Sequence, residues 1–309
     1  MKVWIAHERG RPLLGELPSS VTVEVLADPA APPSDPAGVR LWTPPFLAAS
    51  GALTGLAATM PDLEAVQLLT AGADAWIGRL PPGTRLYDAQ GVHDPATAEW
   101  AVTATLARLR RFDAFAREQA AGRWSFADHV PTDELTGKRV LVVGAGSIGR
   151  AIGARLAPFE VALTWVARSA RPADGVHGVE ELPELLPHAD VVILVVPLTA
   201  ATRGMVDAAF LAAMPDGALL VNAARGPVVD TDALVRELTR GRLHAALDVT
   251  DPEPLPAEHP LWRLPNVLIT PHVAGSVRGM FPRAYALVGA QIRRLAAGEP
   301  LRNEVVGDY

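Results

Sequence analysis

The stretch Arg139–Ala157, "RVLVVGAGSIGRAIGARLA", joins a continuously apolar run to a glycine-rich turn and then to a helical pattern. The motif G-x-G-x-x-G is formed by Gly144, Gly146 and Gly149. Directly after a strand and at the start of a helix, this motif is typical of a dinucleotide-binding βαβ unit, because glycines allow a tight turn and the close approach of a pyrophosphate. The N–H groups of Ser147 and Ile148 would face that anion at the helix N-terminus. The alternative is a glycine-rich turn that binds no ligand.

The strand that follows indicates which dinucleotide would bind. An NAD site usually offers an acidic residue to the ribose hydroxyls about twenty residues after the glycines. Here Ala167 stands at that position in "TWVARSARP", and Arg168, Ser169 and Arg171 follow it. Without the acid a 2′-phosphate is not repelled, and two guanidiniums and a hydroxyl are suited to bind it. We therefore predict NADP as the preferred cofactor and NAD as a weaker one; the alternative is that both arginines are ordinary loop residues.

The bulk composition is that of a soluble enzyme large enough for two domains. The chain has 309 residues, 49% of them apolar, which argues against disorder and allows each domain a core. A net charge of −6 argues against a nucleic-acid or anionic-membrane surface. The absence of cysteine excludes disulfides and thiolate metal sites, and the histidines show no metal-ligand spacing. The N-terminal apolar run is too short for a signal peptide, and no run is long enough to span a membrane, so we expect a cytoplasmic protein without a metal site.

Two series of short apolar runs alternate with helical stretches, which predicts an α/β protein with parallel sheets. The expected strands are residues 2–6, 21–26, 39–42, 65–70 and 84–89, then 139–144, 162–167, 190–196, 217–223, 244–249 and 266–270. Residues 95–121 predict one long helix, and residues 121–138, which lack periodicity, predict the connection between the domains. Residues 281–298 predict a helix that returns to the first domain.

A glutamate and a histidine are set among prolines near the end of the second series. In "DVTDPEPLPAEHPLWRLPNVLITPHVAG", residues 248–275, Glu253 lies between two prolines and His272 follows another. The prolines either punctuate turns or fix a carboxylate and an imidazole that move a proton. The pattern by itself leaves both interpretations open.

With these motifs, the sequence resembles the D-isomer-specific 2-hydroxyacid dehydrogenase family over nearly its whole length. The likeness is carried, in order, by "ELTGKRVLVVGAGSIG", "ADVVILVVPLTAATRGMV", "MPDGALLVNAARGPVVDTDAL", "AALDVTDPEPLP" and "PLWRLPNVLITPHVAG". Within the family, "LWTPPF", "RRFD" and "WVARSARP" are most similar to the NADPH-using glyoxylate/hydroxypyruvate reductases. Thr250, where an aromatic residue is common, and Glu160, in place of a glycine, depart from the family pattern.

The resemblance implies a role for each residue that matches a family motif. The catalytic set would be Arg225, Glu253 and His272. Asp248 matches the residue that holds the nicotinamide carboxamide, and the other positions expected along the cofactor are Val196, Pro197, Thr202 and Ala223. The substrate would be contacted by Arg225 and His272, by Trp42, and by the backbone amides of Ala71 and Gly72.

The resemblance also implies the architecture. It consists of two Rossmann-like domains with parallel sheets, a flavodoxin-like substrate domain and a dinucleotide-binding domain, with the active site in the cleft between them. The implied substrate domain comprises residues 1–98 and 283–309, and the implied cofactor domain residues 99–282. A homodimer formed through the cofactor domain is implied as well, with the helix near residues 99–117 contributing.

The leading hypothesis is an oxidoreductase that transfers a hydride from NADPH or NADH to a small 2-keto acid, giving a D-2-hydroxy acid. His272 would act as the acid, Glu253 would orient its ring and stabilise the imidazolium, and Arg225 would hold the carboxylate and the neighbouring carbonyl oxygen. One alternative is a corepressor-like dinucleotide sensor with little turnover. Another is an enzyme of the same fold with an unusual substrate, such as phosphite or 3-phosphohydroxypyruvate; the lack of basic residues in "LLTAGADAW" disfavours a phosphorylated one.

Overall fold

The computed structural model describes residues 1–48 and 51–307, and the chain divides into two compact units. Unit 1 comprises Met1–His93 and Val277–Tyr309, and unit 2 comprises Asp94–Ser276. The boundaries expected after residues 98 and 282 fall inside helix α2 (Asp94–Leu109) and helix α8 (Met280–Ala296). Because a helix is one cooperative hydrogen-bonded element, the chain changes unit before each of these helices begins rather than within it.

Unit 1 is built on a five-stranded parallel sheet. Its strands are β1 (Lys2–Ile5), β2 (Thr22–Val25), β3 (Val39–Thr43), β4 (Ala65–Gln67) and β5 (Arg85–Tyr87), in the order β2-β1-β3-β4-β5. This is the flavodoxin-like order, as predicted, with each strand inside an expected apolar run or within one residue of it. The direction of winding reverses between β1 and β3, and doubly wound sheets bind ligands beyond the carboxyl ends of the strands at such a point.

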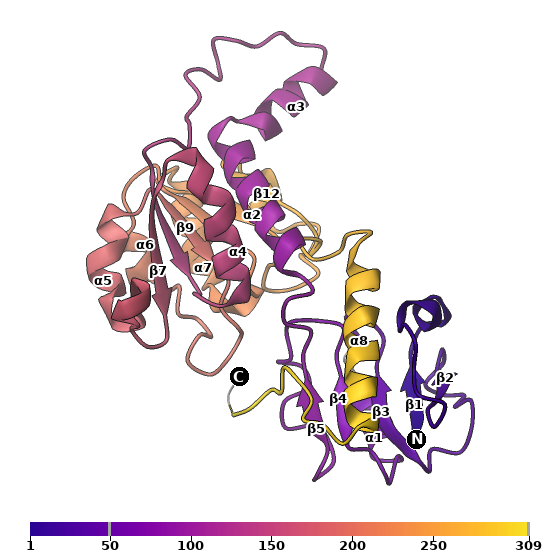
Figure 1. The fold of residues 1–309 in the computed structure, drawn as a ribbon. Helices are drawn as coiled ribbons and strands as arrows, with labels where there is room; N and C mark the ends of the chain where they lie inside the picture. Colours follow the sequence, from indigo (N-terminus) through magenta and orange to yellow (C-terminus); the bar gives the residue numbers. More distant parts are fainter. Residues whose placement is uncertain (49–50, 308–309) are drawn as a thin grey trace. The chain divides into compact units, whose positions relative to one another are not determined.

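Helices cover both faces of this sheet (Figure 1). Val3 and Ile5 of β1 pack in a core with residues of α8, whereas Trp4, between them, packs in a second core with residues of α1 (Gly51–Ala57). This alternation follows the two-residue period of a strand. Gln291 of α8 is fully buried and donates from Nε2 to Gln67 Oε1 of β4 at 2.8 Å. The final helix therefore returns to unit 1, as predicted, and supplies one layer of it.

Unit 2 is built on a seven-stranded parallel sheet. Its strands are β6 (Arg139–Val143), β7 (Ala162–Ala167), β8 (Val176–Gly178), β9 (Val191–Leu194), β10 (Leu219–Asn222), β11 (His244–Leu247) and β12 (Val267–Ile269), in the order β12-β11-β10-β9-β6-β7-β8. All but β8 were predicted; β8, with the sequence VHG, has a single apolar residue and therefore forms no apolar run.

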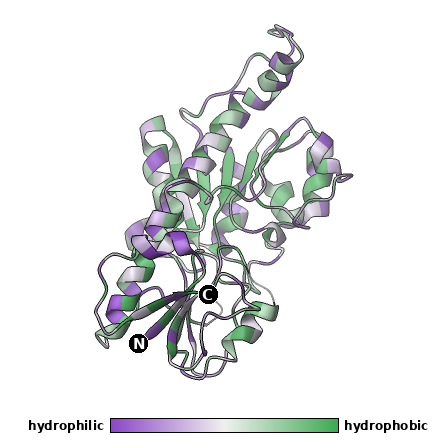
Figure 2. Cartoon of the chain, turned by 90° about the vertical axis from the view of Figure 1, so that its right-hand side faces the viewer, coloured by the Kyte–Doolittle hydropathy of each residue, from purple (hydrophilic) through white to green (hydrophobic). Residues whose placement is uncertain are grey.

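The central strands β6, β9, β10 and β11 are almost entirely buried, which explains their continuous apolar runs, whereas β7 and β12 are only partly buried. Helices α2 and α4 (Ser147–Leu156) cover one face, and α5 (Leu182–Leu185), α6 (Ala208–Ala213) and α7 (Thr231–Thr239) cover the other. Figure 2 shows this sheet as a hydrophobic layer between helices of mixed polarity. The predicted pair of parallel-sheet α/β domains is thereby confirmed.

Two expectations about residues 95–138 are wrong. The predicted single helix is two helices, α2 and α3 (Phe112–Ala120), because the backbone at Arg111 takes a left-handed conformation with φ of 54°. A buried ion pair spans this break, with Arg108 Nη1 at 2.5 Å from Asp113 Oδ2. Residues 121–138 do not connect the two units but lie within unit 2, between α3 and β6.

Candidate active site

The residues singled out in unit 2 follow successive strands at one edge of the seven-stranded sheet. The glycine loop follows β6, Arg168 follows β7, Val196 and Pro197 follow β9, Ala223 and Arg225 follow β10, Asp248 follows β11, and His272 follows β12. Because the strands are parallel, their carboxyl ends lie along the same edge. The winding reverses between β6 and β9, where sheets of this kind bind ligands.

Glu253 and His272 form a hydrogen-bonded carboxylate–imidazole pair. His272 Nδ1 lies 2.6 Å from Glu253 Oε1. Both side chains are partly open to solvent, with exposed fractions of 30% and 42% for His272 and Glu253. A carboxylate accepts, so Nδ1 is the donor, and Nε2 bonds to no residue within 1–48 and 51–307. This ring nitrogen is therefore unengaged in the described residues, and the role of the prolines in placing the pair stays a prediction.

Asp248 anchors the loop that carries His272. Its side chain is 2% exposed; Oδ1 accepts hydrogen bonds from Thr270 Oγ1 at 2.6 Å and Val273 N at 2.9 Å, and Oδ2 accepts from Ala274 N at 2.9 Å. The backbone N–H of His272 donates to Asp248 O at 2.7 Å. These bonds hold His272 at a φ of 54°, which is uncommon for a residue other than glycine. The anchoring was missed from the sequence because it joins residues that follow two different strands.

Arg225 opens the short 3-10 helix η6 (Gly226–Val228) after β10. Its side chain is partly buried, and Nη1 donates to Ala224 O at 2.8 Å. A Cβ at Gly226 would lie 1.9 Å from Thr250 O, so the loop that leads from β11 to Glu253 passes directly against this backbone. The close packing of the two loops brings Arg225 and Glu253 to the same part of the sheet edge.

The glycine loop has the geometry that a pyrophosphate site requires. Gly144 has a φ of +120° and a Cβ there would lie 2.6 Å from Val195 O, while a Cβ at Gly149 would lie 1.9 Å from Gly144 O. At Gly146 a Cβ would meet no atom within 4 Å, so the backbone at that position is open. Helix α4 begins at Ser147 without a side-chain cap, which leaves its first N–H groups to an anion. The residues present therefore fit a dinucleotide.

The loop after β7 carries one unpaired arginine and one anchored arginine. Arg168 and Ser169 are exposed, and Arg168 has no hydrogen-bond or ion-pair partner among the described residues. Arg171 Nη2 donates to Ala145 O at 3.0 Å, and its Nε lies 3.8 Å from Asp174 Oδ2. Arg171 thus braces the glycine loop, whereas no described residue engages the donors of Arg168.

The remaining predicted cofactor positions lie in tight turns at the same edge. Thr202 Oγ1 donates to Pro197 O at 2.6 Å and accepts from Thr199 N at 2.8 Å, which closes the turn after β9 and Val196. Ala223 N donates to Leu194 O at 3.1 Å, which continues the β9–β10 ladder by one residue.

The predicted substrate residues belong to unit 1. Ala71 and Gly72 lie in the loop after β4, at the carboxyl edge of the sheet, where Thr70 Oγ1 donates to Gly72 O at 2.8 Å. Trp42 is fully buried in β3 and meets Trp76 edge-on, with ring centroids 5.7 Å apart. In this position Trp42 contributes to the core, and its contact with a substrate stays a prediction.

Two features are absent from the part of the chain that the structure describes. No group of three or more His, Cys, Asp or Glu side chains in residues 1–48 and 51–307 is placed to hold a metal ion. No helix in the same residues is both long enough and apolar enough to cross a membrane.

Comparison with known proteins identifies the class. Residues 102–274 match the model of the D-isomer specific 2-hydroxyacid dehydrogenase family, NAD binding domain. The match covers more than half of the chain and includes every cofactor and catalytic position discussed in unit 2. The chain belongs to this family and is an NAD(P)-dependent oxidoreductase of the 2-hydroxyacid dehydrogenase class.

Relatives of known structure or function cover both units. A glyoxylate/hydroxypyruvate reductase A from Salmonella paratyphi C is 33% identical over 285 residues, which cover 88% of this chain and 87% of the relative. A D-isomer specific 2-hydroxyacid dehydrogenase from Xanthobacter autotrophicus Py2, solved with NADPH and MES, is 32% identical and has a TM-score of 0.84 over 99% of this chain and 98% of that one. An NADPH-dependent glyoxylate/hydroxypyruvate reductase from Sinorhizobium meliloti, solved with NADP and sulfate, is 28% identical and has a TM-score of 0.83 over 98% of each chain.

Proposed function

We propose that this protein reduces small 2-keto acids of the glyoxylate and hydroxypyruvate type to D-2-hydroxy acids, with NADPH as the preferred cofactor. The observation that carries the proposal is the 2.6 Å contact between His272 Nδ1 and Glu253 Oε1, at the sheet edge that also bears the glycine loop. Names of relatives support the substrate type, and several related structures were solved with NADPH or NADP.

The roles of the catalytic residues follow from their atoms. His272 Nε2, in the imidazolium form, donates a proton to the keto oxygen as C2 becomes tetrahedral. Glu253 keeps the ring oriented through the hydrogen bond that Nδ1 donates. Arg225 offers a planar pair of donors to the substrate carboxylate and to the developing alkoxide. Asp248 positions His272 through the loop that it anchors, in addition to the contact with the nicotinamide carboxamide expected from the family.

The proposed cofactor residues form two sets: one holds the pyrophosphate, and the other binds the 2′-phosphate that distinguishes NADP from NAD. When bound, the nicotinamide supplies the hydride. Backbone amides at Ser147 and Ile148 bind the pyrophosphate beside Gly144, Gly146 and Gly149. Arg168 and Ser169 would hold the 2′-phosphate, with Arg171 bracing the glycine loop, and Val196, Pro197, Thr202 and Ala223 would contact the dinucleotide. On the substrate side, Ala71 and Gly72 bind the carboxylate through their amides, and Trp42 forms the wall behind it.

The test is NADPH and NADH oxidation with glyoxylate, hydroxypyruvate, pyruvate and phenylpyruvate as substrates. We expect faster oxidation of NADPH than of NADH with at least one of them, and loss of that activity in His272→Ala. His188→Ala is the matched control, because His188 is an exposed histidine that precedes β9, at the amino edge of the sheet. Tight NADPH binding without turnover of any acid would instead indicate a dinucleotide sensor.

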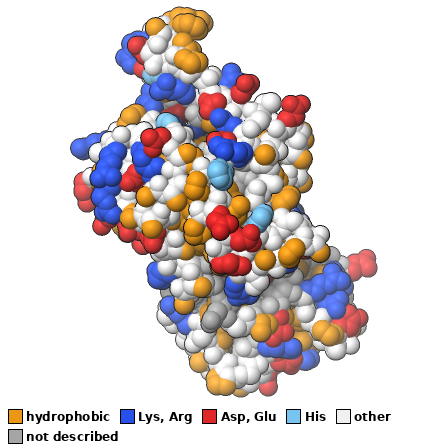
Figure 3. Space-filling view, turned by 90° about the vertical axis from the view of Figure 1, so that its left-hand side faces the viewer, with side chains coloured by type: hydrophobic (Ala, Val, Ile, Leu, Met, Phe, Trp, Pro, Cys, Tyr) orange, Lys and Arg blue, Asp and Glu red, His pale blue; other side chains and the backbone are white. Residues whose placement is uncertain are grey.

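We further propose that the protein is a homodimer whose interface includes the segment from α3 to β6. This segment extends from the rest of unit 2 (Figure 1), and hydrophobic side chains gather at its end (Figure 3). The exposed fractions are 63% for Phe112, 98% for Trp124 and 69% for Phe126. Such a cluster of exposed aromatic side chains is typical of an interaction surface.

Sedimentation velocity tests the dimer. Trp124→Glu should shift the protein toward monomer, whereas the control Val179→Glu, which alters another exposed apolar residue of unit 2, should not. A monomeric wild-type protein at micromolar concentration would contradict the proposal. The cytoplasmic location expected from the sequence stays a prediction.

A further inference from the structure

Arg9 is a cation without a counterion at the carboxyl edge of unit 1. It lies in the 3-10 helix η1 (Glu8–Leu13), which directly follows β1. Its guanidinium carbon lies 3.7 Å from the centroid of the Phe281 ring, a cation–π contact. Within the described residues Arg9 has no hydrogen-bond acceptor and no acidic partner. Arg11, two residues further along, does have partners: it donates from Nε to Glu8 Oε1 at 3.2 Å and from Nη1 to Val23 O at 2.8 Å.

The ring under Arg9 is held in place by other aromatic side chains. Phe281 is stacked with Tyr285, with centroids 6.1 Å apart and an interplanar angle of 12°. His7 meets Phe281 edge-on at 5.1 Å, and Phe46, from the loop after β3, lies at 6.3 Å. Arg9 therefore rests on a rigid surface built by α8 and by the loops after β1 and β3.

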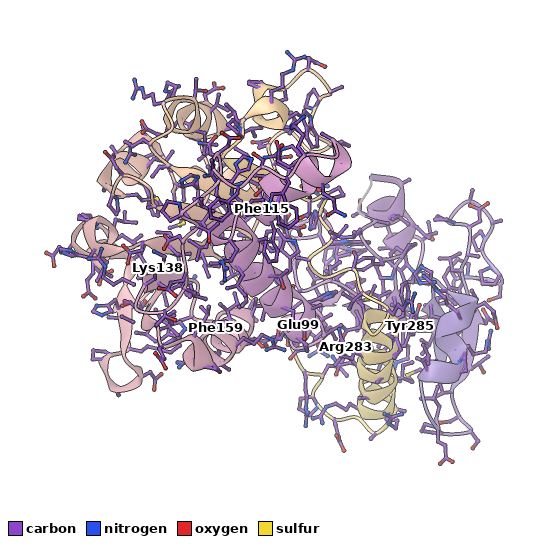
Figure 4. All side chains as sticks on the ribbon, turned by 90° about the horizontal axis from the view of Figure 1, so that it is seen from above. Glu99, Phe115, Lys138, Phe159, Arg283 and Tyr285 are labelled. Carbon is purple, nitrogen blue, oxygen red and sulfur yellow. The ribbon has the colours of Figure 1, made fainter. Side chains whose placement is uncertain are left out.

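The backbone around Arg9 is fixed as well. His7 Nδ1 bonds to Tyr285 Oη at 2.9 Å, and a Cβ at Gly10 would lie within 2.2 to 2.6 Å of three atoms of the Tyr285 ring. Tyr285 projects from α8 toward this N-terminal segment (Figure 4). Contacts on both sides of Arg9 thus pin η1 to α8. A cation held this way loses little conformational freedom when it binds an anion.

Arg9 carries the only positive charge near neutral pH in the aromatic cluster that it forms with His7, Phe46, Phe281 and Tyr285. Burial, and after it the charge of Arg9, lower the pKa of His7, so this ring is neutral at pH 7. Burial raises the pKa of Tyr285 to about 12, so its hydroxyl stays protonated. The aromatic cluster therefore carries one planar guanidinium group stacked on an aromatic ring, and a planar guanidinium suits a carboxylate.

Arg9 lies at the same edge of the unit 1 sheet as the loop after β4, which contains Ala71 and Gly72. Strands β1, β3 and β4 are consecutive neighbours, so the loops after β1 and β4 start two strand spacings apart, about 10 Å. We propose that Arg9 binds a second carboxylate of the substrate, and that the preferred substrates are 2-oxo dicarboxylic acids of four or five carbons. This inference rests on the proposed function, in which Ala71 and Gly72 hold the carboxylate next to the keto group. Glyoxylate is too short to reach Arg9 from that loop.

The experiment compares matched substrates and matched variants. The NADPH-dependent kcat/KM is measured for 2-oxoglutarate and oxaloacetate, for the chain-matched monoacids 2-oxopentanoate and 2-oxobutanoate, and for glyoxylate and 3-phosphohydroxypyruvate. Wild type, Arg9→Met and Arg11→Met are compared. In the wild type, each diacid should exceed its monoacid by roughly tenfold or more. Arg9→Met should lower kcat/KM for the diacids by roughly tenfold to thirtyfold, mainly through KM, and leave the monoacids and glyoxylate within about twofold.

Each outcome separates this inference from the proposed function. Arg11→Met removes the same charge from the same helix and should leave the diacid preference intact. Equal rates for diacids and monoacids, or a uniform loss in Arg9→Met, would overturn the role of Arg9 while glyoxylate reduction still upheld the reductase. A preference for 3-phosphohydroxypyruvate over both diacids would also overturn it, because a phosphate rather than a carboxylate would then be selected. Failure to reduce any acid would refute the proposed function itself, and this inference with it.

Discussion

Two arginines in the loop after β7 allow an effect on cofactor preference to be distinguished from an effect on the stability of the loop. Arg168 is exposed and has no partner in the described part of the chain, so Arg168→Ala removes donors for the 2′-phosphate and breaks no internal contact. A charge-assisted hydrogen bond contributes roughly 1.5–3 kcal/mol, and solvent exposure places this one near the lower end. We therefore expect kcat/KM for NADPH to fall about tenfold to thirtyfold and that for NADH to change less than about threefold.

Arg171 should behave differently because it is part of the scaffold. Its bond to Ala145 O braces the glycine loop, and Asp174 offsets part of its charge. Arg171→Ala should therefore lower kcat/KM for both cofactors, with a smaller change in their ratio. Arg155→Ala is the charge-matched control, because Arg155 lies in the last turn of α4, about 12 Å along the helix from the glycine loop. An unchanged NADPH/NADH ratio in Arg168→Ala would refute the assignment of this residue to the 2′-phosphate.

Three further predictions concern stability. Burial raises the pKa of Asp88 from 3.8 to about 6, so between these pH values Asp88 is protonated in the folded protein and ionised in the unfolded chain. The free energy of unfolding should therefore fall by roughly 3 kcal/mol as the pH rises from about 4 to about 6. Asp88→Asn should remove this part of the pH dependence of Tm, and curves of Tm against pH that run parallel for the variant and the wild type would contradict the prediction. Asp248→Asn leaves one loop N–H without an acceptor and should destabilise the protein by roughly 1–3 kcal/mol in urea unfolding and reduce turnover. Gly10→Ala forces a Cβ into the Tyr285 ring and should cost about 1–3 kcal/mol, whereas the control Gly55→Ala, a helical site with open space around it, should be neutral or stabilising in the same assay.

The strands were predictable because the burial that makes them strands also makes their sequences apolar. In unit 2, β6, β9, β10 and β11 are buried over most of their length, so an apolar run identifies each of them without knowledge of its neighbours. The break between α2 and α3 was not predictable in this way. Apolar residues continue across it at helical spacing, and the left-handed residue Arg111 is held by the ion pair of Arg108 with Asp113, a contact that exists only once the turn has formed.

The candidate site likewise contains some features that a local sequence pattern predicts and others that depend on contacts between distant residues. The glycines were predicted from a short local motif, whereas the roles of Glu253 and His272 were predicted from the resemblance to the family. What holds them was not found, because Asp248 reaches Ala274 across two strands and leaves no local pattern. Arg9 is the residue whose role is least visible in the local sequence. In "HERGRP" nothing distinguishes it from Arg11, and only the return of α8 brings Phe281 beneath one of the two.

The return of α8 also has a consequence for biosynthesis. The strands of unit 1 leave the ribosome before unit 2, yet the helix that covers one face of their sheet is translated after unit 2. Until then, the apolar face that includes Val3, Ile5 and Leu41 has no covering layer, while unit 2 is already complete in sequence. Unit 2 is therefore able to fold on the nascent chain before unit 1, and one face of the unit 1 sheet stays exposed to aggregation until α8 has been synthesised.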